Sequence, residues 1–141
     1  MSDGTIVELA RRWIGTPFHH AESLRAVGCD CLGLVRGIWR DHYSTDAPMP
    51  PVYAPDWLRD GSNEILLTAL KAHLVQVDDE ELQAGQVLLF RWRSEWPASH
   101  VGIATSADKM IHAHDGCGTC EVPLPAACRR RMIARFAFPP I

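Results

Sequence analysis

The chain has 141 residues, enough for one domain of ordinary size, and its composition of 47% hydrophobic and 22% charged residues is that of a globular protein. Its formal net charge of −3 gives no electrostatic basis for binding nucleic acid or an anionic membrane surface. The short run Arg129–Arg131 is expected to be a solvated strand edge. No stretch approaches the roughly 18 consecutive apolar residues of a membrane span, and the N-terminus lacks the apolar run of a secretory signal. We therefore expect a single domain over residues 1–141 that is made in the cytoplasm.

Apolar residues at helical spacing predict a first helix within residues 2–15, which ends before Pro17. Residues 16–29 are expected to form a loop. A second helix is predicted over residues 31–42, where Asp30 is placed to cap the N-terminus. The apolar side chains of this second helix recur at helical spacing and are Leu32, Leu34, Val35, Ile38 and Trp39.

Residues 44–60 contain four prolines, and we expect an extended loop of polyproline character over the domain surface. The following segment, "GSNEILLTALKAHL", predicts a third helix with Ser62 or Asn63 as its N-terminal cap. Its inward-facing side chains are expected to be Ile65, Leu66, Ala69, Leu70 and Leu74.

The second half of the chain consists of short apolar segments that are separated by turn residues and are typical of strands. We expect five strands, within residues 85–92, 99–105, 109–114, 119–124 and 131–138. Helices followed by strands with short connections indicate an α+β fold, with N-terminal helices packed on a small antiparallel β-sheet.

Five cysteines are present, and an odd number without a secretory signal indicates free thiols rather than a disulfide framework. Cys29 and Cys31 could form a metal clip or half of a disulfide set, or could be core residues or a nucleophile. Cys31 falls in the first turn of the second predicted helix, where unpaired backbone N–H groups lower the pKa of a thiol. This position favours Cys31 as a nucleophile, and a small buried hydrophobic residue is the alternative.

A thiolate nucleophile needs a base that a third group holds in place, and seven histidines are available. His100 and His112 fall on two adjacent predicted strands, whose side chains can come within hydrogen-bond reach. If residues 106–109 form the turn, Ile103 faces His112 and His100 lies a little further along. His114 lies on the same face as His112 and is a rival third member.

The pairs Cys29-x-Cys31 and Cys117-x-x-Cys120 also fit the ligand types of a structural zinc site. The spacing of the first pair is tight for two ligands of one zinc ion, and the second pair lies in the glycine-rich turn "DGCGTC". We therefore expect no metal site.

Four segments in chain order, "GTPFHH", "GCDCLGLVRGIW", "LQAGQVLLF" and "SHVGIATSADKMIHA", resemble the NlpC-type cysteine peptidases of bacterial cell walls. The resemblance covers nearly the whole chain and is closest to the subgroup encoded among the tail genes of phages and gene transfer agents. It implies a papain-like α+β fold, with the cysteine at the start of a helix and the base on the sheet. By position it implies that Cys31 is the nucleophile, His100 the general base and His112 the residue that orients the base, so that His114 loses its claim.

The resemblance also implies the reaction. NlpC-type peptidases hydrolyse amide bonds in peptidoglycan stem peptides, commonly between D-glutamate and diaminopimelate, through a thioester and without a metal or organic cofactor. The subgroup implies assembly into a phage-like tail, with tail-tip proteins as partners, and action on the cell wall in the periplasm. The alternative is a catalytically silent tail-assembly protein that has kept the peptidase fold.

One departure from the family pattern concerns the oxyanion. Phe18 stands where family members often have a tyrosine, and the resemblance implies that the hydroxyl of this tyrosine helps at the oxyanion site. A phenyl ring cannot donate a hydrogen bond. The help must then come from the Cys31 backbone N–H or another group, for which His19 and His20 are the candidates.

Two further departures concern structure. Ala21-Glu22 stands where the family usually has Gly-Gly, which alters the wall of the substrate cleft. Gln86 replaces the aspartate of the usual Gly-Asp turn, and its role is expected to be structural.

Overall fold

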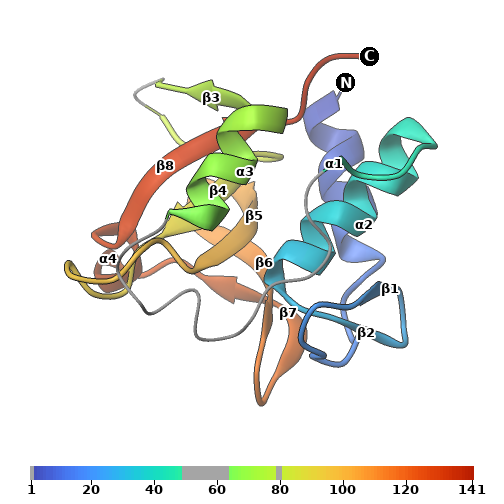
Figure 1. Cartoon of the computed structure of the whole chain (residues 1–141), viewed down its shortest axis with the longest axis horizontal. Helices are drawn as coiled ribbons and strands as arrows, with labels where there is room; N and C mark the ends of the chain where they lie inside the picture. Colours follow the sequence, from blue (N-terminus) through green and yellow to red (C-terminus); the bar gives the residue numbers. More distant parts are fainter. Residues whose placement is uncertain (1, 49–63, 79–80) are drawn as a thin grey trace.

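The computed structural model describes residues 2–48, 64–78 and 81–141, which form helices packed on an antiparallel sheet (Figure 1). The helices are α1 (Ser2–Arg11), α2 (Cys31–Tyr43), α3 (Ile65–His73) and α4 (Ala126–Arg129). The strands are β1 (Ser23–Leu24), β2 (Gly28–Cys29), β3 (Val75–Val77), β4 (Val87–Phe90), β5 (His100–Ser106), β6 (Lys109–His114), β7 (Gly118–Pro123) and β8 (Met132–Ala137). The expected α+β class is confirmed. Within the described ranges, no helix has the length and apolar character needed to cross a membrane.

The main sheet has the strand order β3-β8-β4-β5-β6-β7, and every neighbouring pair in it is antiparallel. β1 and β2 form a separate small hairpin beside the start of α2 (Figure 1). α1 and α2 lie side by side, and α2 packs on the neighbouring strands β5 and β6 of the main sheet. The first turn of α2 is therefore held between the small hairpin and the central strands.

Trp13, in the turn that follows α1, packs on α2, and its side chain is almost fully buried. Gly37 leaves room for the indole, because a Cβ at this position would lie 2.0 Å from the Trp13 ring. Trp13 Nε1 also donates a hydrogen bond to Asp41 Oδ2 at 3.2 Å. These contacts fix the position of α2 relative to α1.

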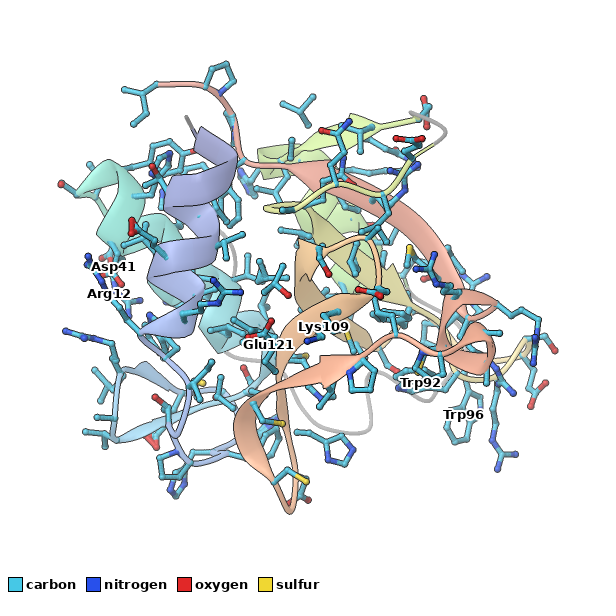
Figure 2. The ribbon with its side chains drawn as sticks, turned by 180° about the vertical axis from the view of Figure 1, so that it is seen from behind. Arg12, Asp41, Trp92, Trp96, Lys109 and Glu121 are labelled. Carbon is cyan, nitrogen blue, oxygen red and sulfur yellow. The ribbon has the colours of Figure 1, made fainter. Side chains whose placement is uncertain are left out.

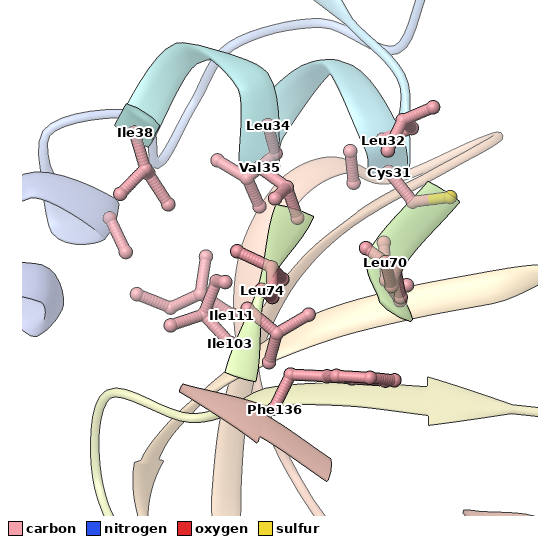
Figure 3. Packing of buried hydrophobic residues seen from close by; sticks show 14 of the residues in the cluster. Cys31, Leu32, Leu34, Val35, Ile38, Leu70, Leu74, Ile103, Ile111 and Phe136 are labelled. Carbon is pink, nitrogen blue, oxygen red and sulfur yellow. The ribbon is translucent and has the colours of Figure 1, made fainter. Parts of the chain in front are cut away.

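The main core lies between α2 and the inner face of the sheet (Figure 3). α2 presents one continuous apolar face, as its spacing predicted, and each fully buried aliphatic side chain contributes about 1.5–3 kcal/mol. The fully buried residues among those labelled in Figure 3 are Leu34, Val35, Ile38, Leu70, Ile103, Ile111 and Phe136.

A second apolar cluster covers the outer face of the same sheet. Successive side chains of a strand point to opposite faces, so the central strand β4 contributes to both clusters and is buried along its whole length. The buried members of the outer cluster are Leu88, Phe90, Ala104, Met110 and Leu124.

The secondary structure differs from the expectations in several places. Residues 16–29 contain β1 and β2 instead of loop alone, and two-residue strands are too short to show an alternating pattern. β3, with three residues, and α4, with four, are also short and were not predicted. Arg129–Arg131 lies at the end of α4 and in the turn before β8, so the expected strand edge is wrong. α3 has Glu64 at its N-cap position, so the expectation of Ser62 or Asn63, which lie outside the described residues, is wrong.

Candidate active site

Asp30 fixes the start of α2 and thereby the position of Cys31. Its carboxylate is only 2% exposed and accepts hydrogen bonds from the backbone N–H of Gly33 at 2.7 Å and of Ala21 at 2.6 Å. The first bond is the predicted N-cap. The second holds the preceding loop against the helix, and Cys31 is the first residue of α2.

Gly33 allows that loop to cross directly over the first turn of α2. A Cβ at Gly33 would lie 1.8 Å from the backbone carbonyl oxygen of Glu22, far inside contact distance. The same carbonyl accepts a hydrogen bond from Asp30 N at 3.3 Å, and Ser23 Oγ donates to Gly33 O at 2.6 Å. The glycine two residues after Cys31 is therefore a packing requirement.

The register between β5 and β6 differs by one residue from the expected one. Ile103 pairs with Ile111 rather than with His112, because the ladder is irregular after Ala104 and leaves Thr105 as an extra residue. The pairs that the structure gives for these two strands end at Ile103 and Ile111. His100 and His112 thus lie beyond the paired part of the ladder.

The imidazoles of His100 and His112 are joined by a hydrogen bond. His100 Nε2 lies 2.8 Å from His112 Nδ1, and the two rings are nearly perpendicular at 82°. The ring of His114 is close, with centroid distances of 5.6 Å to His112 and 6.5 Å to His100. Within the described part of the chain, no hydrogen bond joins His114 to either ring. The structure therefore pairs His100 with His112.

Cys31 lies against the same end of β5, where the backbone of Val101 forms a hydrogen bond with its thiol. Both Cys31 and His100 are buried, with 6% and 8% of their surface exposed. The indole of Trp92 covers one side of His100 at a ring-centroid distance of 5.6 Å and stacks on Phe90. Sequence reasoning did not single out Trp92, because an aromatic residue after a buried strand is common in cores.

The pKa of the Cys31 thiol is raised to about 12, first because the side chain is buried and then because the Asp30 carboxylate is close. Hydrogen bonds from the backbone, including that of Val101, lower it by less. The expected lowering of this pKa by the helix N-terminus is therefore wrong, since desolvation disfavours the thiolate more strongly. Cys31 is a neutral thiol at neutral pH in this structure.

The two histidines are neutral as well. Burial is the largest cause that lowers the pKa of His100 to about 3 and that of His112 to about 4, and neighbouring histidines lower both further. In a hydrogen bond between two neutral imidazoles, one ring nitrogen donates and the other accepts. At neutral pH the site therefore holds a neutral thiol and two neutral imidazoles, and not a preformed ion pair.

We expect the free energy of unfolding to fall as the pH drops from 7 to 5. In the unfolded chain these histidines bind a proton near pH 6.5, whereas in the folded chain they stay neutral down to about pH 4 and about pH 3. The unfolded state then binds more protons, which removes about 2 kcal/mol of stability per histidine between pH 7 and pH 5. Urea denaturation at several pH values measures this slope. His112→Gln should reduce this loss of stability by the contribution of one histidine, about 2 kcal/mol, and an unchanged slope in this variant contradicts the prediction.

Comparison with known proteins identifies the family. The family model described as NlpC/P60 matches residues 15–128. The chain belongs to the NlpC/P60 family. Among curated proteins it is similar to the probable endopeptidase NlpC of Escherichia coli (strain K12), with 27% identity over 112 residues. That match covers 79% of this chain and 62% of the relative, so the chain spans less than two thirds of the relative's length.

Solved structures confirm the NlpC/P60 fold. An NlpC/P60 family protein from Bacillus cereus matches with a TM-score of 0.72 and 19% identity, covering 98% of this chain and 40% of that chain. The NlpC/P60 domain of the peptidoglycan hydrolase SagA matches with a TM-score of 0.67 and 20% identity, and the match covers 96% of this chain and 98% of that chain. RipD from Mycobacterium tuberculosis is described as a non-catalytic NlpC/P60 domain protein. It matches with a TM-score of 0.62 and 13% identity, and the match covers 97% of this chain and 96% of that chain. The NlpC/P60 fold therefore occurs both in peptidoglycan hydrolases and in a non-catalytic protein.

The loop that crosses α2 carries the three residues expected on the oxyanion side. The backbone of Phe18 forms a bridge with Cys29, and its ring packs partly buried against the core. His19 and His20 are exposed. His20 Nδ1 lies 3.9 Å from Asp30 Oδ2, which places His20 beside the cap of α2.

Ala21 occupies a left-handed backbone conformation that favours glycine. Its φ of 63° is left-handed, and a side chain there costs about 1 kcal/mol. We expect Ala21→Gly to raise the free energy of unfolding by about 0.5–1 kcal/mol, measured by urea denaturation. Ala127→Gly, at an exposed position of α4, is the control and should lower it. A loss of stability in Ala21→Gly would overturn this account.

The remaining cysteines do not assemble a site in the part of the chain that the structure describes. All five cysteines are free thiols, and the thiol of Cys29 lies 3.3 Å from Thr119 Oγ1 in the interior. No group of three or more histidine, cysteine or acidic side chains arranged to hold a metal ion occurs among the described residues.

Proposed function

We propose that this chain is a cysteine peptidase that hydrolyses amide bonds in peptidoglycan stem peptides. Cys31 is the nucleophile, His100 is the general base, and His112 positions the base. The observation that carries the proposal is the 2.8 Å hydrogen bond between the rings of His100 and His112, at the end of β5 that contacts Cys31. Membership of the NlpC/P60 family supports the class of reaction.

In the proposed reaction, Cys31 Sγ attacks the carbonyl carbon of the substrate amide while His100 takes the thiol proton. His100 Nε2–H donates to His112 Nδ1, so that Nδ1 of His100 is free to accept this proton. His100 then gives the proton to the leaving amine, and the C–N bond breaks to leave a thioester. Water attacks the thioester, with its proton passing through His100 to the departing sulfur. The products are a carboxylic acid and an amine, and the thiol is restored without a metal or organic cofactor.

The developing negative charge on the carbonyl oxygen needs a donor, and Phe18 cannot supply one. We assign this role to the backbone N–H of Cys31, which lies at the N-terminus of α2 where such groups are unpaired within the helix. His20 is the proposed second donor, because it lies next to the Asp30 cap.

The finer parts of the proposal rest on the motif resemblance. They are a D-glutamyl–diaminopimelate bond as the target, a single domain over residues 1–141, and delivery in a phage-like tail that opens the cell wall from the periplasmic side. Tail-tip proteins would then be partners. Electron microscopy of purified particles that carry a labelled copy of this chain tests the delivery, and particles without the label contradict it.

Incubation with defined muropeptides, followed by mass spectrometry of the products, tests the proposed activity. A mass gain of one water molecule, shared between two fragments of a stem peptide, is the expected result, and the fragment masses identify the cleaved bond. Intact muropeptides after incubation with correctly folded protein would overturn the peptidase proposal.

His112 and His114 should differ in their effect on this reaction. His112→Ala removes the hydrogen bond that positions His100, so kcat is expected to fall by about 10- to 100-fold with little change in KM. His114 makes no such hydrogen bond with His100, so His114→Ala should leave kcat near the wild-type value. His112→Gln, which can still accept a hydrogen bond, should recover part of the loss. Equal kinetics for His112→Ala and His114→Ala would contradict the assignment.

The alternative is a tail-assembly protein that has kept the fold without the activity. Two observations favour it: Phe18 lacks the hydroxyl group, and the Cys31 thiol is buried with a raised pKa. A non-catalytic NlpC/P60 protein, RipD, shares the fold. The muropeptide experiment distinguishes the two functions, because the silent protein leaves every stem peptide intact.

A further inference from the structure

An arginine-lined pocket opens beside the candidate active site and has no part in the chemistry described above. Its volume is about 430 Å³. Three arginines, one tryptophan, one serine and one aliphatic residue line it: Arg91, Trp92, Ser94, Arg130, Arg131 and Ile133. No carboxylate is among these lining residues, although the chain as a whole carries a net charge of −3. The pocket is therefore locally positive in an acidic protein.

The positive charge of this pocket is only partly neutralised. Arg91 forms an ion pair with Glu64 at 2.6 Å, but its Nε is buried without a hydrogen-bond partner. Arg131 donates to the backbone carbonyl of Trp92 and forms no ion pair with a carboxylate of the described residues. The guanidinium of Arg130 makes no hydrogen bond or ion pair with any described residue. As far as the described residues show, an anion in the pocket would meet an Arg130 guanidinium that is not already committed.

Trp92 joins the pocket to the candidate base. Trp92 lines the pocket, and its ring centroid lies 5.6 Å from that of His100. An extended peptide advances about 3.3 Å per residue. A substrate whose scissile amide lies at Cys31 and His100 can thus place a group one to three residues away in the pocket.

We propose that this pocket is a subsite for a carboxylate group of the peptide substrate. The inference rests on the proposed function, because it assumes a peptide held across Cys31 and His100. Peptidoglycan stem peptides carry free carboxylates within this distance of their amide bonds, and guanidinium groups bind carboxylates with paired, charge-assisted hydrogen bonds. Arg130 is the principal ligand, Arg91 and Arg131 add positive charge, and Trp92 forms the wall shared with the reaction centre.

The test compares two stem tetrapeptides, one with free carboxylates and one with the same groups amidated. The variants are Arg130→Gln and, as a matched control, Arg12→Gln, an exposed arginine at the opposite end of the molecule from Trp92 (Figure 2). Arg130→Gln is expected to raise KM for the free acid about tenfold, with kcat retained, and to leave KM for the amidated peptide unchanged. Arg12→Gln should match the wild type on both peptides.

Binding of the same peptides to Cys31→Ala protein, measured by calorimetry, separates this subsite from the proposed activity. Weaker binding of the free acid on adding Arg130→Gln supports the subsite even if the wild-type chain cleaves nothing. Cleavage that is insensitive to Arg130→Gln, or binding that does not distinguish the acid from the amide, overturns the subsite and leaves the peptidase proposal standing.

Discussion

Replacing Cys31 by alanine is expected to abolish the cleavage of muropeptides while the fold is retained. The proposed thioester cannot form without the sulfur atom, and the loss of a nucleophile lowers kcat by at least about 10³-fold. The change removes one buried atom and leaves the Asp30 cap intact, so the free energy of unfolding should change by about 1 kcal/mol. Product masses and a urea unfolding curve, recorded on the same preparation, check both statements.

Cys29→Ala is the matched control, because it removes the same atom two residues earlier. Cys29 is also buried, but its thiol contacts Thr119 in the interior. Cys29→Ala should therefore cost some stability and keep most of the activity. Full cleavage by Cys31→Ala, or a complete loss in both variants, would exclude Cys31 as the specific nucleophile.

Of the substitutions that add a single methyl group near the site, Gly33→Ala is expected to destabilise the fold most. The new Cβ would lie 1.8 Å from the backbone carbonyl of Glu22, and a backbone atom cannot move aside as a flexible side chain can. The loop would have to leave the helix, which also strains the bond from Ala21 N to Asp30. We expect a loss of about 3 kcal/mol or more in the free energy of unfolding, measured by urea denaturation.

Gly4→Ala provides the comparison for this substitution. Gly4 lies in α1 and is exposed, and a Cβ there would meet no atom within 4 Å. Replacing it should raise the free energy of unfolding by about 0.5 kcal/mol, since alanine is the better helix former. If Gly33→Ala were as stable as Gly4→Ala, the loop would not press on α2 as described.

The start of α2 could be predicted from sequence because its causes are local. The capping aspartate stands directly before the first apolar residues at helical spacing, and no proline interrupts them. α2 begins at Cys31 as expected. β6 was predicted with its observed bounds, Lys109–His114, because alternating residues between turns give a clear strand signal. The contact between His100 and His112 was predicted because the strands that carry them, β5 and β6, were expected to be neighbours.

The details of the site depend on contacts between distant parts of the chain and could not be predicted in this way. The extra residue Thr105 in the β5–β6 ladder has no local signature, yet it shifts the register so that Ile103 faces Ile111 instead of His112. The raised pKa of Cys31 arises from burial by the whole fold, which outweighs the local effect of the helix N-terminus. Trp92 follows the end of β4 and His100 begins β5, so their contact depends on how these two strands pair and has no local signal in the sequence.

The burial of Cys31 also governs how the protein withstands oxidation. Peroxides and disulfides react with exposed thiolates, and a thiol with a pKa of about 12 and 6% exposure offers neither property. Cys117 is exposed after the end of β6 and is the thiol that oxidants reach first. A protein built in this way keeps its proposed nucleophile reduced in an oxidising medium, where a permanently ionised cysteine would be converted to sulfenic acid before it met a substrate.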